Sequence, residues 1–374
     1  GGGGGGPRGG GCATRAGGFA EGFGGARARG GAARGGGGAA PPAPAAVPRL
    51  AGVSKQTVSR VLNDHPAVRT ETRQAVLEAM RTLGYRPSRS ARSLASGRTR
   101  MLGVISFDAA RYGPASTLTA INTAAQKAGY LVSSIALDTA DRNTVVEAVD
   151  RLSAEGADGI IAIAPQRPVA TALARARPDT PLVMLDNGLG DGTPVVSSDF
   201  TAGARLATGH LLDLGHPTVR HIAGPTGWTS ADRRAASWRE TLTRAGARVH
   251  EPLVGDWSAD SGYELGRRLA GDRDVTAVFV SNDQMALGLL RALHEAGRRV
   301  PQDVSVVGYD DIPEAAHLLP PLTTIRTDYS SIGTMALRLL LRQLDGPEPT
   351  ADEPERDPVV PVELIVRDST AAAG

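Results

Sequence analysis

The stretch AGVSKQTVSRVLN, from Ala51 to Asn63, predicts a sharp turn that runs into a short helix. Gly52 permits the bend because glycine adopts backbone angles that other residues avoid. Ser54 is a favourable N-cap, since its hydroxyl can accept a hydrogen bond from an unpaired backbone N–H of the first turn. Val53 and Val58 have the spacing of a hydrophobic staple. We therefore expect a helix that begins directly after Ser54 and packs on a neighbouring helix.

The outward face of this helix carries only hydrogen-bonding side chains. Its apolar residues, Val58, Val61 and Leu62, share the opposite face. In the DNA major groove a glutamine pairs with adenine and an arginine with guanine, while Ser and Thr hydroxyls bind phosphates or base edges. A solvated amphipathic helix is the alternative interpretation. The side chains predicted to contact DNA from this segment are Ser54, Lys55, Gln56, Thr57, Ser59, Arg60 and Asn63.

A further amphipathic helix follows at residues 70–83, TETRQAVLEAMRTL, with Gly84 as its C-cap. Its apolar residues at helical spacing are Val76, Leu77, Met80 and Leu83. Three small helices could therefore share one core if a first helix precedes Ala51.

The basic segment RSARSLAS, residues 89–96, contains one large apolar residue, Leu94. A leucine can unstack a base step in the minor groove while neighbouring arginines neutralise phosphates. The alternative is a charged linker in which Leu94 packs on the next domain. Tyr85, Arg89, Arg92 and Leu94 complete the predicted DNA-contacting set.

The sequence before Ala51 is unfavourable for the first helix of a helix-turn-helix. In PAPAAVPRLAGVS, Pro48 falls inside the expected helix, at a cost of ~3 kcal/mol or more.

Residues 1–44 consist mainly of Gly, Ala, Arg and Pro, so we expect a disordered tail. Cys12 is the only cysteine. An internal disulfide is therefore impossible, which favours a reducing, cytoplasmic location.

Charge is concentrated around the turn and the basic segment. Residues 49–100 contain 11 basic and 3 acidic side chains, whereas the whole chain has a net charge of only +2. A cationic patch supplies salt-dependent affinity for phosphates, and the acidic remainder keeps the rest of the molecule away from the duplex. No apolar run has the length of a membrane helix, so we expect no membrane partner.

The remaining residues predict an α/β core of doubly wound parallel sheets. Apolar runs alternate with helical stretches, which is typical of parallel strands joined by crossover helices. About 270 residues exceed one typical domain and indicate two lobes. The runs read as buried strands are MLGVISF, YLVSSIAL, GIIAIAP and PLVMLD in the first half, and RHIAGP, AVFVSND and DVSVVGYDD in the second, with helices at 201–214 and 283–296 between them.

Polar side chains stand where these strands end, which is where such sheets bind ligands. Asp186 closes PLVMLD, Asn282 closes AVFVSND and Asp310 closes VSVVGYDD, while Arg234 and Trp257 lie in loops or helix starts. Carboxylates, an amide and a guanidinium bind vicinal hydroxyls, and an aromatic face covers the apolar side of a sugar ring. The alternative is that Asp186, Asp283 and Asp311 only cap the helices that follow.

Two other functions compete with a sugar-controlled DNA-binding protein. A glycosidase would need two carboxylates that face each other across the scissile bond, and nothing in the sequence forbids Asp186 and Asp310 from this role. We find no nucleophile elbow, phosphate-binding glycine loop or metal-ligand spacing, so we expect no enzyme activity, catalytic residue, metal or cofactor. An exported sugar-binding protein would need a signal peptide and no DNA-binding headpiece.

Together these motifs resemble the lactose/galactose repressor (LacI/GalR) family of bacterial transcription factors. AGVSKQTVSRVLN and LGYRPSRSARSLAS resemble its headpiece and hinge helix. GDWSADSGYELG, VSNDQMALGLLRAL, DVSVVGYDDIPEA and PPLTTIRTDY resemble its effector-binding core. The resemblance implies a recognition helix with Lys55, Gln56 and Arg60, and a minor-groove leucine at position 94. It also implies two lobes joined by three crossing strands around a sugar. The implied effector-binding residues are Asp186, Arg234, Trp257, Asn282, Asp310 and Tyr329.

The resemblance also implies the organisation of the molecule. We expect a tail at 1–44, a headpiece at 45–86, a hinge at 87–100 and the two-lobed core at 101–374. A homodimer would bind a pseudo-palindromic operator, with the sugar controlling operator affinity as inducer or co-repressor. The alternative within this fold is a sugar-binding protein whose headpiece does not function. Phe107, Arg111, Tyr112 and Ser198 depart from the family's first-lobe pattern, so a galactoside is the first expectation and another saccharide the second.

Overall fold

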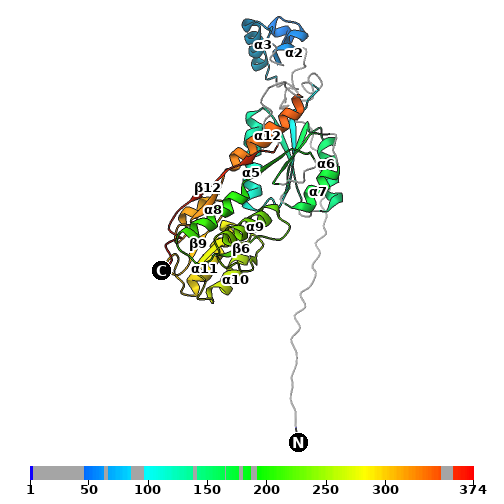
Figure 1. Cartoon of the computed structure of the whole chain (residues 1–374). Helices are drawn as coiled ribbons and strands as arrows, with labels where there is room; N and C mark the ends of the chain where they lie inside the picture. The colour runs from blue at the N-terminus through cyan, green and yellow to red at the C-terminus, as the bar shows by residue number, and fades with distance from the viewer. Residues whose placement is uncertain are drawn as a thin grey trace. The chain divides into compact units, whose positions relative to one another are not determined.

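The computed structural model describes residues 1–2, 46–62, 66–85, 97–137, 141–164, 166–176, 180–186, 192–346 and 357–374. It divides into two compact units, Gly1–Arg86 and Pro87–Gly374 (Figure 1). Residues 3–44 of the predicted tail and residues 87–96 of the predicted hinge lie outside the described residues, and so do Asn63, Arg89, Arg92 and Leu94. No helix among the described residues is both long and apolar enough to span a membrane.

The described residues of the first unit form three short helices around one small core. They are α1 (Ala46–Ala51), α2 (Lys55–Leu62) and α3 (Thr70–Thr82). Ser54 caps α2 as predicted, because its Oγ accepts the backbone N–H of Thr57 at 3.1 Å. At the end of α3, Gly84 has φ +60° and the Tyr85 N–H donates to the Met80 carbonyl at 2.9 Å, which closes the helix. The core consists of Val47, Val58, Val61, Val76, Ala79 and Met80.

Two predictions for this unit are wrong. Leu77 was expected in the core but is 44% exposed. The structure also forms the first helix despite its proline. Pro48 lies in the first described turn of α1, and in a first turn backbone N–H groups have no intrahelical acceptor, so a missing N–H costs little. Val47 is fully buried beside it, and the Pro48 carbonyl accepts the Val53 N–H at 3.0 Å.

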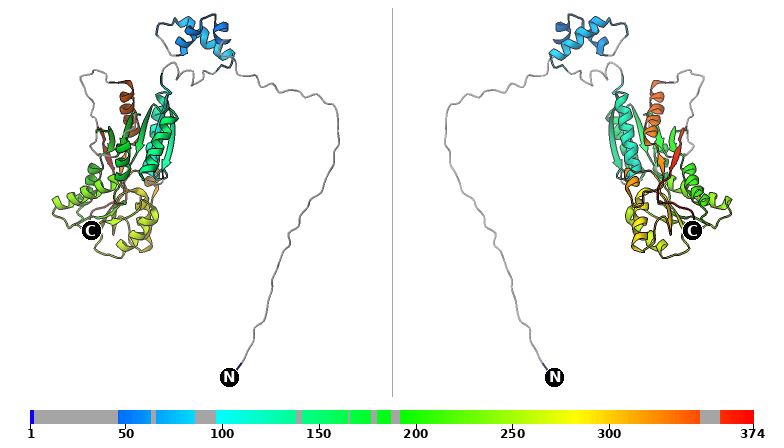
Figure 2. Two further views of the ribbon diagram at one scale, coloured as in Figure 1. Left: turned by 90° about the vertical axis from the view of Figure 1, so that its right-hand side faces the viewer. Right: turned by 90° about the vertical axis from the view of Figure 1, so that its left-hand side faces the viewer.

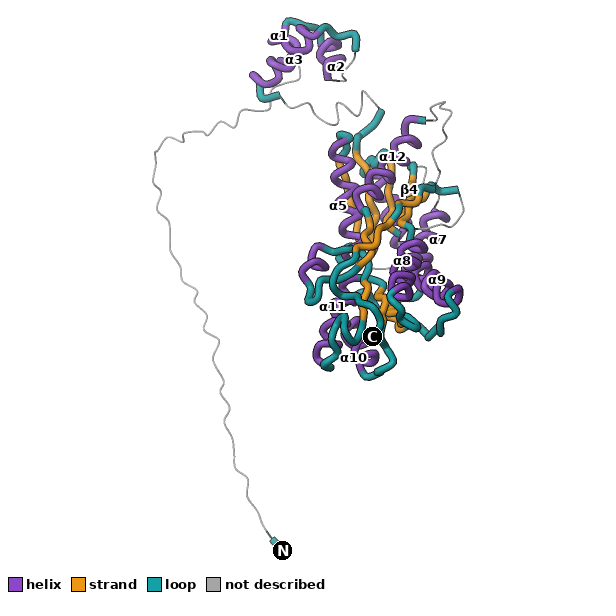
Figure 3. Tube along the Cα trace, turned by 60° about the vertical axis from the view of Figure 1, so that its left-hand side comes forward, coloured by secondary structure: helices purple, strands orange, loops and turns teal. Residues whose placement is uncertain are grey.

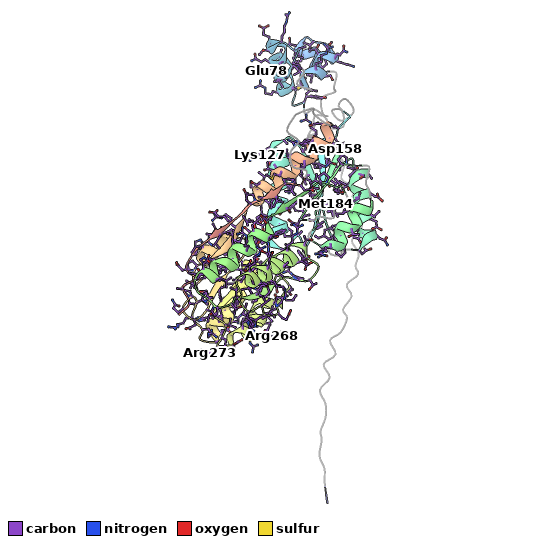
Figure 4. All side chains as sticks on the ribbon, in the orientation of Figure 1. Glu78, Lys127, Asp158, Met184, Arg268 and Arg273 are labelled. Atoms are coloured by element: carbon purple, nitrogen blue, oxygen red, sulfur yellow. The ribbon has the colours of Figure 1, made fainter. Side chains whose placement is uncertain are left out.

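The first lobe of the core is a six-stranded parallel sheet with helices on both faces (Figure 1). The strand order is β11-β5-β4-β3-β1-β2. One face packs against α5 and α12, and the other packs against α6 and α7. Met184 of β4, labelled in Figure 4, is fully buried in this lobe. The elements are β1 (Met101–Phe107), α5 (Tyr112–Lys127), β2 (Leu131–Leu137), α6 (Arg142–Ala154), β3 (Gly159–Ile163), α7 (Arg167–Ala176), β4 (Leu182–Leu185), β5 (Val195–Ser198), α12 (Tyr329–Asp345) and β11 (Val359–Val360).

The second lobe repeats the arrangement with a four-stranded parallel sheet, β7-β6-β8-β9. Helices α8 and α9 cover one face, and α10 and α11 cover the other. The elements are α8 (Phe200–Asp213), β6 (Arg220–Ala223), α9 (Thr229–Arg244), β7 (Leu253–Val254), α10 (Ala259–Ala270), β8 (Ala277–Val280), α11 (Asp283–Glu295), β9 (Ser305–Val307), the 3-10 helix η1 (Pro313–His317), β10 (Thr324–Thr327) and β12 (Val362–Ile365). The predicted alternation and parallel pairing are confirmed.

Three crossings join the lobes, as the resemblance implied (Figure 2). The chain passes from β5 into α8, returns from β10 into α12, and passes again from β11 to β12, which pairs antiparallel with β10. One strand differs from its prediction. Strand β2 was read as buried, but it lies at the sheet edge and Leu131 is 44% exposed.

Candidate functional site

A cavity of about 310 Å³ lies between the two lobes, and all six predicted effector-binding residues line it. Asp186 and Tyr329 come from the first lobe and the crossing into α12, and the others come from the second lobe. Carboxyl ends of parallel strands meet at one edge of a sheet, which is why residues far apart in sequence converge here. The residues are Asp186, Arg234, Trp257, Asn282, Asp310 and Tyr329.

Three of these residues have an unusual backbone. Asp186, Trp257 and Asp310 have φ values of +64°, +72° and +109°, a region that L-residues rarely adopt. Such conformations persist only where the surrounding structure enforces them, and they concentrate at functional sites. The segments that follow the strands therefore hold these residues at the cavity at some cost in local backbone energy.

Arg234 is the central cation of the cavity and is 5% exposed. Its Nη1 donates to the Ser281 carbonyl at 2.5 Å, and its Nη2 lies 3.8 Å from Asp310 Oδ1. The guanidinium stacks over the Tyr309 ring at 3.5 Å from the ring centroid. A planar cation held in this way has a fixed orientation and presents its remaining N–H groups to the cavity.

Burial and the positive charge of Arg234 shift the pKa values of two nearby carboxyl groups in opposite directions. Burial raises the pKa of Asp310 to about 6, and Arg234 opposes this rise. Burial likewise raises the pKa of Asp186 to about 6, again opposed by Arg234. The Tyr329 hydroxyl donates to Asp310 Oδ1 at 3.1 Å, and burial holds its own pKa well above 10, so it remains a donor. At neutral pH both carboxylates are mainly ionised and able to accept ligand hydroxyls.

Four residues that line the cavity each carry a buried side-chain polar atom with no hydrogen-bond partner among the described residues. The atoms are Ser198 Oγ, Arg234 Nε, Trp257 Nε1 and Thr327 Oγ1. Buried polar groups are nearly always paired, so a cluster of unpaired ones marks a place for a polar ligand.

Asn282 lines the cavity and also makes hydrogen bonds within the protein. Its Oδ1 caps α11 by accepting the Met285 N–H at 3.0 Å, and its Nδ2 donates to the Trp257 carbonyl and to Gln284 Oε1, both at 3.0 Å. Most of its hydrogen-bonding capacity is thus engaged within the protein. Asn282 therefore holds Trp257 and Gln284 in place around the cavity.

The alternative that Asp283 and Asp311 only cap the following helices is wrong. Asp283 is fully buried and accepts the Ile312 N–H at 2.9 Å and the Thr324 hydroxyl at 2.6 Å, while Asn282 caps the helix instead. Asp311 forms ion pairs with Arg326 at 2.7 Å and Arg367 at 2.6 Å. The described residues after Asp186 lead to β5, so no described helix follows for it to cap.

Four first-lobe residues depart from the family pattern, and the structure places one of them in the core and three at the cavity. Phe107 is 1% exposed inside the first-lobe core, because β1 turns it toward α6, whereas Arg111, Tyr112 and Ser198 line the cavity.

Sequence reasoning missed Trp228, Ser230 and Gln284, which also line the cavity. The first two follow β6 in GPTGWTS, and the position of that loop after a strand could have indicated them. Aromatic rings pair edge to face on both walls, Tyr112 with Tyr329 at 5.8 Å and Trp228 with Trp257 at 5.6 Å.

Among the described residues, no group of three or more His, Cys, Asp or Glu side chains could hold a metal ion.

The predicted base-contacting side chains of α2 are accessible: Lys55, Gln56, Ser59 and Arg60 are exposed. Thr57 is half-buried, with its hydroxyl hydrogen-bonded to Ser54 at 2.9 Å. Tyr85 packs against the three-helix core, so its ring is partly engaged there.

A helix-turn-helix unit followed by a two-lobed core with a polar cavity defines a ligand-binding, DNA-binding regulator. Comparison with known proteins agrees. The model of bacterial regulatory proteins of the lacI family matches residues 46–88, and that of the periplasmic binding protein-like domain matches residues 208–370.

Relatives of known function cover most of the chain. The lactose operon repressor of Escherichia coli (strain K12) is 36% identical over 330 residues, which are 87% of this chain and 90% of the repressor. The transcriptional repressor PurR of Haemophilus influenzae is 32% identical over 86% of this chain and 97% of its own length. A crystal structure of the lac repressor dimer bound to operator and the anti-inducer ONPF superposes with a TM-score of 0.76 at 35% identity, covering 87% of this chain and 98% of that chain. The chain belongs to the lacI family and is a DNA-binding transcriptional repressor with a ligand-binding core.

Proposed function

We propose that this repressor is controlled by a neutral saccharide bound between its lobes, with a galactoside as the first candidate. One observation supports the proposal: two carboxylates, the Arg234 guanidinium and four residues with an unpaired buried polar atom line one cavity with aromatic walls. A sugar offers adjacent hydroxyls that both donate and accept, together with an apolar ring face. The charges of Arg111 and Arg234 offset those of Asp186 and Asp310 in the cavity lining, so the cavity does not call for a charged ligand.

The headpiece supports operator binding by a homodimer. Lys55, Gln56, Ser59 and Arg60 are exposed on one face of α2 while Val58 and Val61 anchor the other face, which is what insertion into the major groove requires. Two such helices in a dimer match a pseudo-palindromic operator. We propose that Ser54 and Thr57 bind phosphate, and that Asn63, Tyr85, Arg89, Arg92 and Leu94 extend the interface toward the minor groove.

Sugar and operator are then thermodynamically coupled. If the saccharide favours one arrangement of the lobes and the operator favours another, each ligand changes the affinity for the other by the same factor. The formed α1, with Val47 in the three-helix core, argues against the alternative of a sugar-binding protein with a non-functional headpiece.

A thermal-shift screen of the full chain against a sugar panel, repeated with an operator duplex selected from random DNA, tests the proposal. We expect one saccharide to raise the melting temperature and to change operator affinity in a fluorescence anisotropy titration. Arg234→Met should abolish the sugar response but keep DNA binding, and Gln56→Ala should do the reverse. Stabilisation by a sugar without selection of any DNA would instead indicate a binding protein, and hydrolysis of the sugar would indicate an enzyme.

A further inference from the structure

The two lobes share a short piece of backbone pairing at one rim of the cavity. Helix α7 of the first lobe begins there, and the Arg167 N–H donates to the Gly227 carbonyl of the second lobe at 3.2 Å. Beside it, Gln166 and Trp228 form an isolated antiparallel bridge. Helix α9, which follows the loop that contains Gly227 and Trp228, lies below α7 in Figure 3. The β6–α9 loop is therefore attached to the first lobe through its main chain.

An ion pair reinforces this attachment. Arg167 Nη2 lies 3.3 Å from Asp232 Oδ2, while Asp232 Oδ1 accepts the Gly227 N–H at 3.4 Å. Gly227 has φ +87°, a conformation that glycine adopts without steric cost, and both of its backbone polar groups are engaged. Asp232 thus holds the loop of its own lobe and the arginine of the other lobe at once.

The attached segment carries part of the proposed ligand site. Trp228, Ser230 and Arg234 line the cavity from the loop and the first turns of α9. Asp232 lies within the same turns, and its N–H donates to the Trp228 carbonyl at 2.9 Å. Any separation of the lobes at this rim breaks the Arg167 contacts and releases the segment that presents Trp228.

We propose that Arg167 and Asp232 are positioning residues for the ligand, which hold the start of α9 against the first lobe so that both walls of the cavity contact the sugar together. The proposal rests on the proposed function for the nature of that ligand. Because an ion pair then forms between the lobes, affinity for an uncharged sugar depends on ionic strength. The side chains are 63% and 30% exposed, so the pair contributes a modest two- to fivefold, on the order expected for solvent-exposed pairs.

A double-mutant cycle in the full chain tests this, with calorimetric titration of methyl β-D-galactopyranoside at about 0.05 M and about 1 M salt. We expect Arg167→Gln and Asp232→Asn each to weaken binding about two- to fivefold at low salt, and the double variant to be no weaker than either single variant. At high salt the differences should vanish, and Arg167→Lys should retain most of the affinity. The control Arg244→Ala breaks the pair of Arg244 with Glu240, 2.5 Å apart within the second lobe on α9, and should change nothing. Losses that multiply in the double variant would overturn the proposal.

A distance measurement in the absence of sugar tests the role of the ion pair independently of the proposed saccharide effector. Spin labels on Cys residues introduced at Glu147 of α6 and Ala245 after α9, in a Cys12→Ser background, report the distance between the lobes. Asp232→Asn should broaden and lengthen that distance distribution, whereas Arg244→Ala should not. If methyl β-D-galactopyranoside binds no variant, the proposed effector fails and the distances alone decide. Unchanged distances in Asp232→Asn would then refute the role of the ion pair.

Discussion

Replacing Arg234 by methionine should destabilise the core, and the loss should depend on pH. Arg234 is the cation that opposes the burial of Asp186 and Asp310. Their pKa values are about 6 in the folded protein, above the ordinary 3.8. A carboxyl with a raised folded pKa contributes stability that is present below its unfolded pKa and lost as pH rises through its folded pKa. Without Arg234 both pKa values rise further, so more stability is lost at alkaline pH.

The magnitude follows from the geometry. Removal of one partner from a buried ion pair costs about 3–5 kcal/mol. The 3.8 Å separation of Arg234 from Asp310, together with the hydrogen bond from Tyr329, places the expected loss near the lower end, about 3 kcal/mol at pH 8. At pH 5 both acids are largely protonated, and the loss of stacking on Tyr309 leaves about 1 kcal/mol.

Urea unfolding of the wild-type core and of Arg234→Met at pH 5 and pH 8 measures both values. Arg239→Met is the matched control, because Arg239 lies on the same helix with its side chain 49% exposed, and it should change stability by no more than about 0.5 kcal/mol. An equal loss at both pH values, or a larger loss at pH 5, would refute the reasoning that Arg234 compensates the buried carboxylates.

Three further predictions concern other parts of the chain. Burial beside Asp310 raises the pKa of Asp283 to about 8, so the melting temperature should fall as pH rises from 5 to 9, and Asp283→Asn should flatten this slope in thermal denaturation. In Gly262→Ala the new Cβ would lie 2.1 Å from the Met285 carbonyl and force α10 from α11; urea titration should show a loss of about 1–3 kcal/mol, and an unchanged midpoint would contradict this packing. Met80→Ala removes a side chain that is 6% exposed and should cost the small three-helix unit about 2–5 kcal/mol, abolishing operator binding by anisotropy while calorimetry shows an intact sugar response.

Much of the fold was predictable because its signals are local. Apolar runs such as GIIAIAP fill whole strands, and helices such as Asp283–Glu295 end within one residue of the prediction because caps and glycines mark their boundaries. The short strands Val195–Ser198 and Leu253–Val254 were not predicted, since only their neighbours in the sheet make them strands. Pro48 was misjudged because its cost depends on where the helix begins, and the sequence before it does not mark that start.

The amino-acid sequence by itself determined the turn and polar helix at 51–63 and the alternation of strands and helices, because these follow from side-chain chemistry and periodicity over a few neighbouring residues. The full set of six residues that line the cavity was implied by the family resemblance of the sequence motifs. Only the tertiary structure decided that Asn282 caps α11, that Phe107 is core, that Arg234 balances two buried carboxylates, and that Arg167 meets Asp232 across the lobes. Burial and ion pairing depend on which distant segments the fold brings together, and no local pattern encodes those distances.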